Sequence, residues 1–241
     1  MTSAVSFDAG NTLLYSDPPP PVIYAEHMSR LGSPVEPERA AATFSRVWAG
    51  MQLELEPGTD RYHVVPGGEQ GWWREFVRRV VAELRHDAPV DELFRSLYTA
   101  FTDPRIWRVY PDVLPVLREL RSSGHRLAVV SNWDSRLPRL LQDLGLASWF
   151  DAIVVSAVEG VEKPAPDIFH RAARRLGVAP GEVTHIGDSP REDYHGALGA
   201  GLGAVLLDRR ASFAANGFRR VGSLAELPAL LRGDDPARGE G

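Results

Sequence analysis

The 241-residue sequence contains no cysteine and no long apolar run. Without cysteine a disulfide framework is excluded, and a cytoplasmic protein is the simplest expectation. Every apolar stretch falls short of the roughly 18 residues typical of a membrane-spanning helix. The first eight residues lack the basic and apolar regions of a secretory signal. A formal net charge of −5 argues against nucleic acid as a partner, because nucleic-acid binders usually present a basic patch.

Lysine and asparagine are also scarce. Lys163 is the one lysine among the 27 basic residues, and asparagine occurs only at positions 11, 132 and 216. A bias toward GC-rich codons accounts for this shortage. The one remaining lysine is then either a chance survivor of that bias or is present because arginine would not serve at position 163. Composition alone leaves the two explanations even.

Short apolar runs followed by helical spacing predict an α/β fold. Strands are expected at residues 4–7, 126–131, 152–156, 183–187 and 203–207. The expected helices lie at 112–123, 135–144, 165–176, 191–200 and 223–232. Strands that alternate with helices indicate a Rossmann-like parallel sheet with helices on both faces.

A second pattern fills the long interval between the first two strands. Apolar residues recur at three- and four-residue spacing over 22–31, 36–54, 69–86 and 90–102, after a stiff linker expected at 18–21. An all-helical domain inserted into the sheet domain is therefore predicted. The expected boundaries are 1–17 and 108–232 for the core and 18–107 for the insert, with a flexible tail at 233–241.

Residues with reactive side chains follow several of the predicted strands. In open parallel sheets, ligands bind beyond the carboxyl ends of the strands. The side chains expected at that edge are three carboxylates, a hydroxyl, an amide and the single lysine: Asp8, Asp188, Asp193, Ser131, Asn132 and Lys163. Three carboxylates and one lysine leave an excess of two negative charges, which a divalent cation neutralises. Oxygen ligands favour Mg²⁺, which often shares its coordination shell with a substrate phosphate.

An aspartate that faces a metal-bound phosphate is a suitable nucleophile and forms an aspartyl-phosphate. The loop that begins at Asp8 also carries Gly10 and Thr12, which offer backbone N–H groups and a hydroxyl to phosphate oxygens.

These residues occur in stretches that resemble the four motifs of the haloacid dehalogenase superfamily, in the order of that family. The stretches are residues 7–14 (Phe-Asp-Ala-Gly-Asn-Thr-Leu-Leu), Ser131-Asn132, Lys163-Pro164, and Gly187-Asp188-Ser189 with Asp193. The helical insert is similar to the type 1 cap of that family. Residues 71–73 (Gly-Trp-Trp) and 131–134 (Ser-Asn-Trp-Asp) further resemble the subfamily named after a rhythmically expressed insect gene product.

The resemblance implies a role for each matching residue. Asp8 would be the nucleophile and a metal ligand, with the Gly10 carbonyl and the Asp188 carboxylate as further ligands. Asp193 would support the metal, directly or through water. Lys163 would neutralise nucleophile and phosphate together, and a compact ammonium suits a crowded pocket better than a planar guanidinium.

Thr12 and Ser131 would bind phosphate oxygens, and Asn132 is grouped with them as a substrate-binding residue. The implied activity is Mg²⁺-dependent hydrolysis of a small phosphorylated metabolite.

Gly10 departs from the pattern of phosphatases in this family. They usually have a second aspartate two residues after the nucleophile, which protonates the leaving group and then activates water. General acid–base help is worth about 10²–10⁴-fold. Gly10 keeps the carbonyl but lacks the carboxyl, so we expect metal binding to persist while efficient turnover of alkyl phosphates is in question.

Three alternatives follow from this departure. A catalytically weak binding or regulatory protein is one. A 2-haloacid dehalogenase ranks lower, because Gly187-Asp188 places a carboxylate where metal-free dehalogenases avoid one. Schiff-base phosphonate cleavage is excluded, because the predicted cap contains no lysine.

The cap residues considered for substrate selection are Arg61, His63, Trp73 and Arg74. The expected oligomeric state is a monomer or a weak homodimer.

Overall fold

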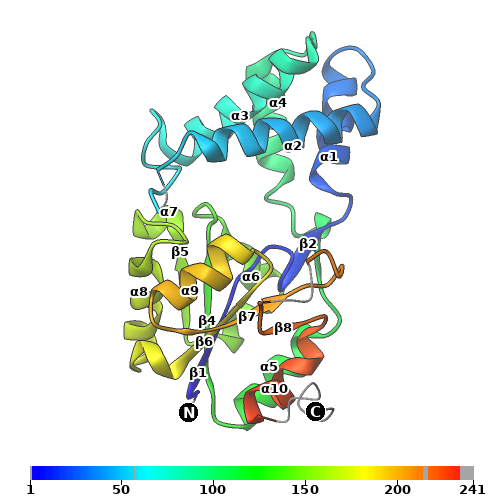
Figure 1. Ribbon diagram of the computed structural model, residues 1–241. Helices are drawn as coiled ribbons and strands as arrows, with labels where there is room; N and C mark the ends of the chain where they lie inside the picture. The colour runs from blue at the N-terminus through cyan, green and yellow to red at the C-terminus, as the bar shows by residue number, and fades with distance from the viewer. Residues whose placement is uncertain (1, 57, 214–216, 234–241) are drawn as a thin grey trace.

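The computed structural model describes residues 2–56, 58–213 and 217–233, which form a sheet domain and a helical domain stacked on it (Figure 1). Six parallel strands lie in the order β5-β4-β1-β6-β7-β8. Their bounds are β1 (Ala4–Phe7), β4 (Arg126–Ser131), β5 (Ala152–Val155), β6 (Val183–Gly187), β7 (Gly203–Leu207) and β8 (Arg220–Val221). The predicted α/β class is confirmed, and of these six strands the short β8 was not expected.

Helices cover both faces of this sheet, as predicted. One face packs on α5 (Val113–Ser122), α6 (Leu137–Asp143) and α10 (Leu227–Arg232), and the other on α8 (Pro166–Leu176) and α9 (Gly196–Gly199). Alternate residues of β4 point to opposite faces of the sheet. Leu127 and Val129 pack on the side of α5, α6 and α10, and Ala128 and Val130 pack on the side of α8 and α9. The strands therefore consist mostly of apolar residues, and this is why short apolar runs located them.

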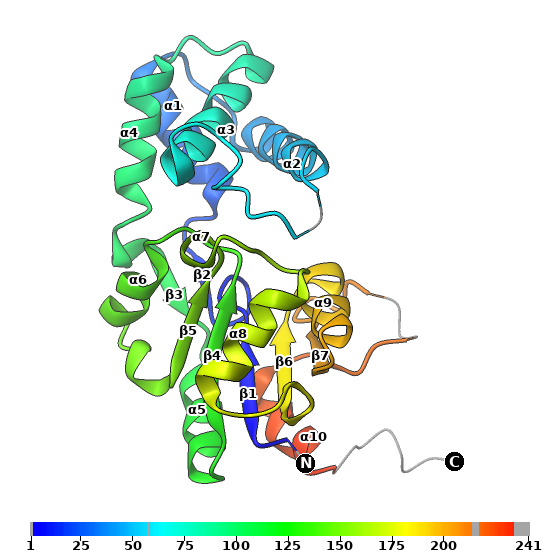
Figure 2. The same ribbon diagram turned by 90° about the vertical axis from the view of Figure 1, so that its left-hand side faces the viewer.

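The insert is a bundle of α1 (Pro20–Leu31), α2 (Pro37–Leu53), α3 (Gly68–Leu84) and α4 (Val90–Ala100). It has an apolar core of its own, in which Trp72, Phe76 and Leu93 are fully buried. Figures 1 and 2 show this bundle above the carboxyl ends of the strands. We propose that residues 18–107 act as a cap domain over the sheet.

Four local features differ from the sequence predictions. The proline-rich segment expected as a linker instead starts α1. Pro20 and Pro21 occupy its first turn, where the N–H group that proline lacks would have no partner within the helix. A two-stranded antiparallel ribbon, β2 (Leu14–Ser16) with β3 (Trp107–Val109), joins the two domains. The helix expected at 191–200 is a π-helix, Pro190–His195, followed by α9. The last predicted helix begins as a 3₁₀ turn, Leu224–Glu226.

Further short elements are the 3₁₀ turns Pro104–Ile106, Ala147–Trp149 and Pro180–Glu182 and the helix α7 (Ser156–Glu159). The tail predicted from residue 233 onward lies, beyond Gly233, outside the described residues. In the described part of the chain, no helix has the length and apolar character needed to cross a bilayer.

Candidate active site

Strand register brings three of the candidate residues to one edge of the sheet. Phe7, the last residue of β1, pairs with Val129 of β4 and Ile186 of β6. Asp8 therefore emerges between the ends of two neighbouring strands, near Ser131 and Asp188. This edge lies beneath the helical domain, and a cavity of about 690 Å³ lined by residues of both domains lies there.

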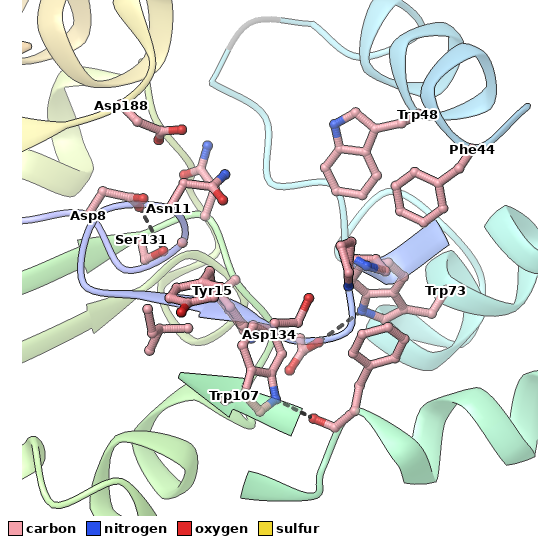
Figure 3. Close-up of a pocket in the computed structure, with 18 of the residues that line it drawn as sticks. Asp8, Asn11, Tyr15, Phe44, Trp48, Trp73, Trp107, Ser131, Asp134 and Asp188 are labelled. Atoms are coloured by element: carbon pink, nitrogen blue, oxygen red, sulfur yellow. Dashed lines mark hydrogen bonds between the residues drawn. The ribbon is translucent and has the colours of Figure 1, made fainter. Parts of the chain in front are cut away.

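Asp8 is held by two side-chain donors on the same oxygen. The Ser131 hydroxyl donates to Oδ1 of Asp8 at 2.9 Å, and Lys163 Nζ donates to it at 2.8 Å. Figure 3 shows the contact with Ser131. Among the described residues, no hydrogen bond goes to Oδ2, so this oxygen is left for an incoming group. Burial, followed by the nearby Asp193 carboxylate, raises the pKa of Asp8 despite the opposing effect of Lys163.

Lys163 is a buried residue, with 2% of its surface exposed. Its ammonium bridges Asp8 and Asp193, the second contact being 2.5 Å to Oδ1 of Asp193. Burial alone would favour the neutral amine, but the Asp193 and Asp8 carboxylates outweigh it and raise the pKa of Lys163. A permanent positive charge therefore lies beside the candidate nucleophile.

Asp188 completes a cluster of acidic oxygens. One carboxylate oxygen from each of Asp8, Asp188 and Asp193 lies within 4.8 Å of the other two. Burial, together with repulsion from Asp8 and Asp193, raises the pKa of Asp188 to about 7. Negative charge gathered in this way is what a divalent cation stabilises, and the donors are all oxygen, as Mg²⁺ prefers.

Asp193 is placed by the π-helix and by a neighbouring glycine. The N–H groups of Asp193 and Tyr194 both donate to the Ser189 carbonyl, which widens the turn and directs Asp193 inward. A Cβ added at Gly187 would lie 2.1 Å from Cγ of Asp193, so only glycine fits there. Both Asp193 oxygens already have protein partners: Oδ1 contacts Lys163 and His185 Nε2, and Oδ2 accepts from the Ser189 N–H.

Of two residues grouped with phosphate binding, Asn132 lines the cavity and Thr12 does not. Thr12 is fully buried and does not line the cavity, and its hydroxyl lacks a hydrogen-bond partner within the described chain. The Asn132 side chain forms two hydrogen bonds with the backbone of Lys163. It accepts from the N–H at 2.7 Å and donates to the carbonyl at 2.9 Å. Asn132 also donates to Glu192 at 3.1 Å. The structure therefore gives Asn132 a positioning contact with the lysine loop, and it does not bring Thr12 to the cavity.

Gly10 faces an aromatic ring. A Cβ added at Gly10 would lie 3.3 Å from the six-membered ring of Trp133. Trp133 lines the cavity and packs against Trp107, with 5.2 Å between ring centroids. The space where an acidic side chain at position 10 would begin is thus bordered by an indole.

A buried ion pair joins the cap to the lysine loop. Arg61, in the segment between α2 and α3, donates to both carboxylate oxygens of Glu162, at 2.8 and 3.1 Å. The two side chains are only 3% and 6% exposed. The Arg61 guanidinium also lies over the rings of Trp48 and Trp72, about 5.5 Å from each centroid. Because Glu162 directly precedes Lys163, this ion pair lies next to the candidate site.

A second contact joins α3 to the loop after β4. Trp73 Nε1 donates to Asp134 at 2.9 Å, as Figure 3 shows. Asp134 also accepts from Arg136, and Glu69 accepts from the backbone N–H of Ser135 at 2.8 Å. Polar contacts thus fix the cap over the sheet on two sides of the cavity.

Of the four cap residues considered for substrate selection, only Trp73 lines the cavity. Arg61 is engaged by Glu162, Arg74 by Asp91 on the surface, and His63 by the buried Asp60. Sequence reasoning missed Phe44 and Trp48, which line the cavity from α2. Their four-residue spacing on one helix face was a usable signal.

The geometry and the sequence together define the class of protein. The profile of haloacid dehalogenase-like hydrolases matches residues 2–201, so the chain belongs to this family and is a hydrolase. It is 33% identical to haloacid dehalogenase-like hydrolase domain-containing protein 3 of Bos taurus, over 84% of this chain and 80% of that protein. It is 29% identical to the rhythmically expressed gene 2 protein of Drosophila melanogaster, over 86% and 83%. The predicted subfamily resemblance is confirmed.

Relatives with phosphatase names also match. The glyceraldehyde 3-phosphate phosphatase of Methanopyrus kandleri is 34% identical over 87% of this chain and 85% of its own. A solved phosphatase of the same superfamily from Thermococcus onnurineus superposes with a TM-score of 0.66 at 27% identity, over 96% and 98% of the two chains.

Proposed function

We propose that this hydrolase is a Mg²⁺-dependent phosphatase that acts on a small phosphorylated molecule through an aspartyl-phosphate on Asp8. The observation that carries the proposal is the arrangement around Asp8. Lys163 and Ser131 hold one carboxylate oxygen, the other is free of protein donors within the described chain, and two more carboxylates lie beside it. The phosphatase-named relative supports the same class of substrate.

The donor set fits a divalent metal ion. Asp8 and Asp188 would hold it through carboxylate oxygens, and the Gly10 carbonyl would be a further ligand. Asp193 would support the ion directly or through water, while its two oxygens also accept from Lys163 and from the Ser189 N–H. When bound, the ion would supply positive charge to the phosphate and to the carboxylates around it.

The protein's own groups supply the nucleophile and the positive charge beside it. Oδ2 of Asp8 would attack phosphorus while Lys163 and Ser131 keep Oδ1 in place. The Lys163 ammonium would lower the repulsion between the carboxylate and the incoming phosphate. Water would then cleave the aspartyl-phosphate, returning Asp8 and releasing phosphate.

Gly10 supports the alternative that this chain is a catalytically weak binding or regulatory protein. The carboxyl expected two residues after the nucleophile is absent, and Trp133 borders that space. Metal-free dehalogenation is disfavoured by the third carboxylate, Asp188, since an acidic cluster without a cation would repel the carboxylate of a haloacid.

The test compares Asp8→Asn with wild type, using acetyl phosphate and p-nitrophenyl phosphate with and without Mg²⁺. Both substrates have leaving groups that need little protonation, so a missing acid does not mask activity. We expect Mg²⁺-dependent turnover by wild type and its loss in Asp8→Asn. Asp91→Asn, the same substitution at an exposed cap site, is the matched control and should retain activity.

Persistent turnover by Asp8→Asn would remove Asp8 as the nucleophile. Absence of turnover by wild type on both substrates would favour the binding or regulatory alternative.

A further inference from the structure

Many aromatic side chains line the cavity beyond the carboxylates. Figure 3 shows Asp8 and Asp188 at one end, and Phe44, Trp48 and Trp73 of the cap at the other. Trp107 lies between these two ends. A volume of about 690 Å³ falls in the range of sites that enclose a drug-sized ligand. The cavity is therefore much larger than a phosphate group requires.

Few positive charges face this space. The cationic residues among the described lining are Lys163, Arg136 and Arg210. Lys163 is held between two carboxylates, and Arg136 donates to Asp134 and to the Tyr98 carbonyl while its guanidinium stacks on the Tyr98 ring at 3.9 Å.

The remaining cation is at the periphery, because Arg210 is an exposed residue. A second phosphate or a carboxylate on the substrate would thus enter an aromatic space without a dedicated partner, and burying such a charge unpaired is costly.

The leaving oxygen lacks the acid that a side chain at position 10 would supply. Position 10 has no side chain, and its place is bordered by Trp133. Asp134 accepts from Trp73 and Arg136, so its oxygens are engaged. Asp188 belongs to the acidic cluster around the nucleophile. Of the other carboxyls in the described cavity lining, Glu192 accepts from Asn132 and Asp17 pairs with Arg108. An oxygen that must leave without protonation has to be a stable anion, which a phenolic oxygen is and an alkyl oxygen is not.

We propose that the substrate is an aryl phosphate monoester, whose aromatic and uncharged organic part occupies the space between Trp133 and the cap rings of Phe44, Trp48 and Trp73. This inference rests on the proposed function and specifies its substrate class. The Asp8 Oδ2–phosphorus bond forms as the bond from phosphorus to the phenolic oxygen breaks, and the aryloxide leaves with the electron pair and takes a proton from water. Water then hydrolyses the aspartyl-phosphate to phosphate and the Asp8 carboxylate, releasing one proton.

Binding tests recognition without chemistry. Asp8→Asn retains the cavity and removes the nucleophile, so its affinity for 1-naphthyl phosphate and for glycerol 2-phosphate can be compared by calorimetry in the presence of Mg²⁺. We expect 1-naphthyl phosphate to bind at least about tenfold more tightly, because only its ring buries apolar surface against the cavity walls. Equal affinities, or tighter binding of glycerol 2-phosphate, would overturn the inference.

Turnover by wild type separates the inference from the proposed function. Acetyl phosphate tests Asp8 chemistry without an aromatic group, and 1-naphthyl phosphate adds the ring. We expect kcat/KM for 1-naphthyl phosphate to exceed that for acetyl phosphate, even though acetyl phosphate has the better leaving group. We also expect 1-naphthylmethyl phosphate, an alkyl ester of similar shape, to turn over about 100-fold more slowly, a factor within the range of the missing acid.

Good turnover of acetyl phosphate with poor turnover of 1-naphthyl phosphate would refute the substrate class and leave the proposed function intact. No turnover of either, combined with tight binding of 1-naphthyl phosphate to Asp8→Asn, would refute the proposed function while supporting aromatic recognition.

Cap variants locate the aromatic contact. Phe44→Leu and Trp48→Leu replace a ring by a smaller apolar side chain, and each should lower the ratio of kcat/KM for 1-naphthyl phosphate to that for acetyl phosphate by about fivefold or more. The ratio is measured within one preparation, so partial loss of folded protein cancels. Leu53→Ala, which alters an apolar cap side chain that is 82% exposed, should leave the ratio unchanged. Unaltered ratios in both ring variants would contradict the proposed contact.

Discussion

Glu162→Gln is expected to destabilise the protein strongly, because it leaves a buried guanidinium without its counterion. The Arg61 and Glu162 side chains are 3% and 6% exposed, and two side-chain hydrogen bonds of 2.8 and 3.1 Å join them. Removing one partner of a buried pair costs about 3–5 kcal/mol. For a chain of this size, 1 kcal/mol corresponds to a shift in Tm of about 2–4 °C, so we expect a decrease of at least about 6 °C.

Two measurements check this expectation. Urea denaturation gives the free energy of unfolding, and hydrogen exchange of the Ser135 amide, which donates to Glu69 of the cap, reports whether the cap stays docked. Asp91→Asn is the control, since it breaks an exposed pair with Arg74 and should cost less than about 1 kcal/mol. Replacing both partners by apolar residues, Arg61→Met with Glu162→Leu, should recover most of the loss.

A loss below about 1 kcal/mol in Glu162→Gln, with unchanged exchange at Ser135, would refute the reasoning. So would a double variant that is as unstable as Glu162→Gln alone, because the cost would then not come from an unpaired charge.

Three further predictions concern the site and the cap. Gly10→Asp should raise kcat for alkyl phosphates about tenfold or more, but only in combination with Trp133→Leu, which makes room for the new side chain. Steady-state kinetics that show no rise in the double variant would contradict this. Mg²⁺ should raise the Tm of the protein. The affinity of the protein for Mg²⁺, measured by calorimetry, should increase from pH 6 to 8, because Asp188, with a pKa of about 7, must lose its proton to bind the ion. Asp188→Asn should abolish both effects. Trp73→Phe should cost about 1.5–3 kcal/mol by removing a hydrogen bond to the Asp134 carboxylate, and urea denaturation indistinguishable from wild type would exclude this role.

The sheet could be predicted from sequence because its strands are buried on both faces. Four strand predictions, 4–7, 126–131, 183–187 and 203–207, agree with the structure at both ends. The π-helix at Pro190–His195 was not predictable in this way, since it depends on an additional residue in the turn that the apolar spacing does not reveal. The ribbon formed by β2 and β3 was not predicted, because each of these strands has only three residues.

The site was predictable where strand ends fixed it. Asp8, Ser131 and Lys163 meet as the motif positions implied, and the burial of Lys163 favours a chemical need for lysine over codon drift. Contacts between distant segments were not predictable, and the pairing of Arg61 with Glu162 across 101 residues is the main example. The buried position of Thr12 and the contact of Asn132 with the Lys163 backbone were not predictable, because side-chain direction in a loop depends on tertiary contacts. The phosphate-binding roles of Thr12 and Asn132 stay predictions. The cytoplasmic location and the monomeric or weakly dimeric state stay predictions.

The central position of β1 has a consequence for the order of folding during synthesis. β1 leaves the ribosome first, yet its two neighbours are β4 and β6, the second of which begins at Val183. At a synthesis rate of about 5–20 residues per second, roughly 10–35 seconds pass between the synthesis of β1 and that of β6. The helices α1–α4 are contiguous and have their own core, so we expect the cap to fold while β1 still waits for its partners. The nascent chain would thus carry a folded helical domain before Asp8 has its neighbours in place.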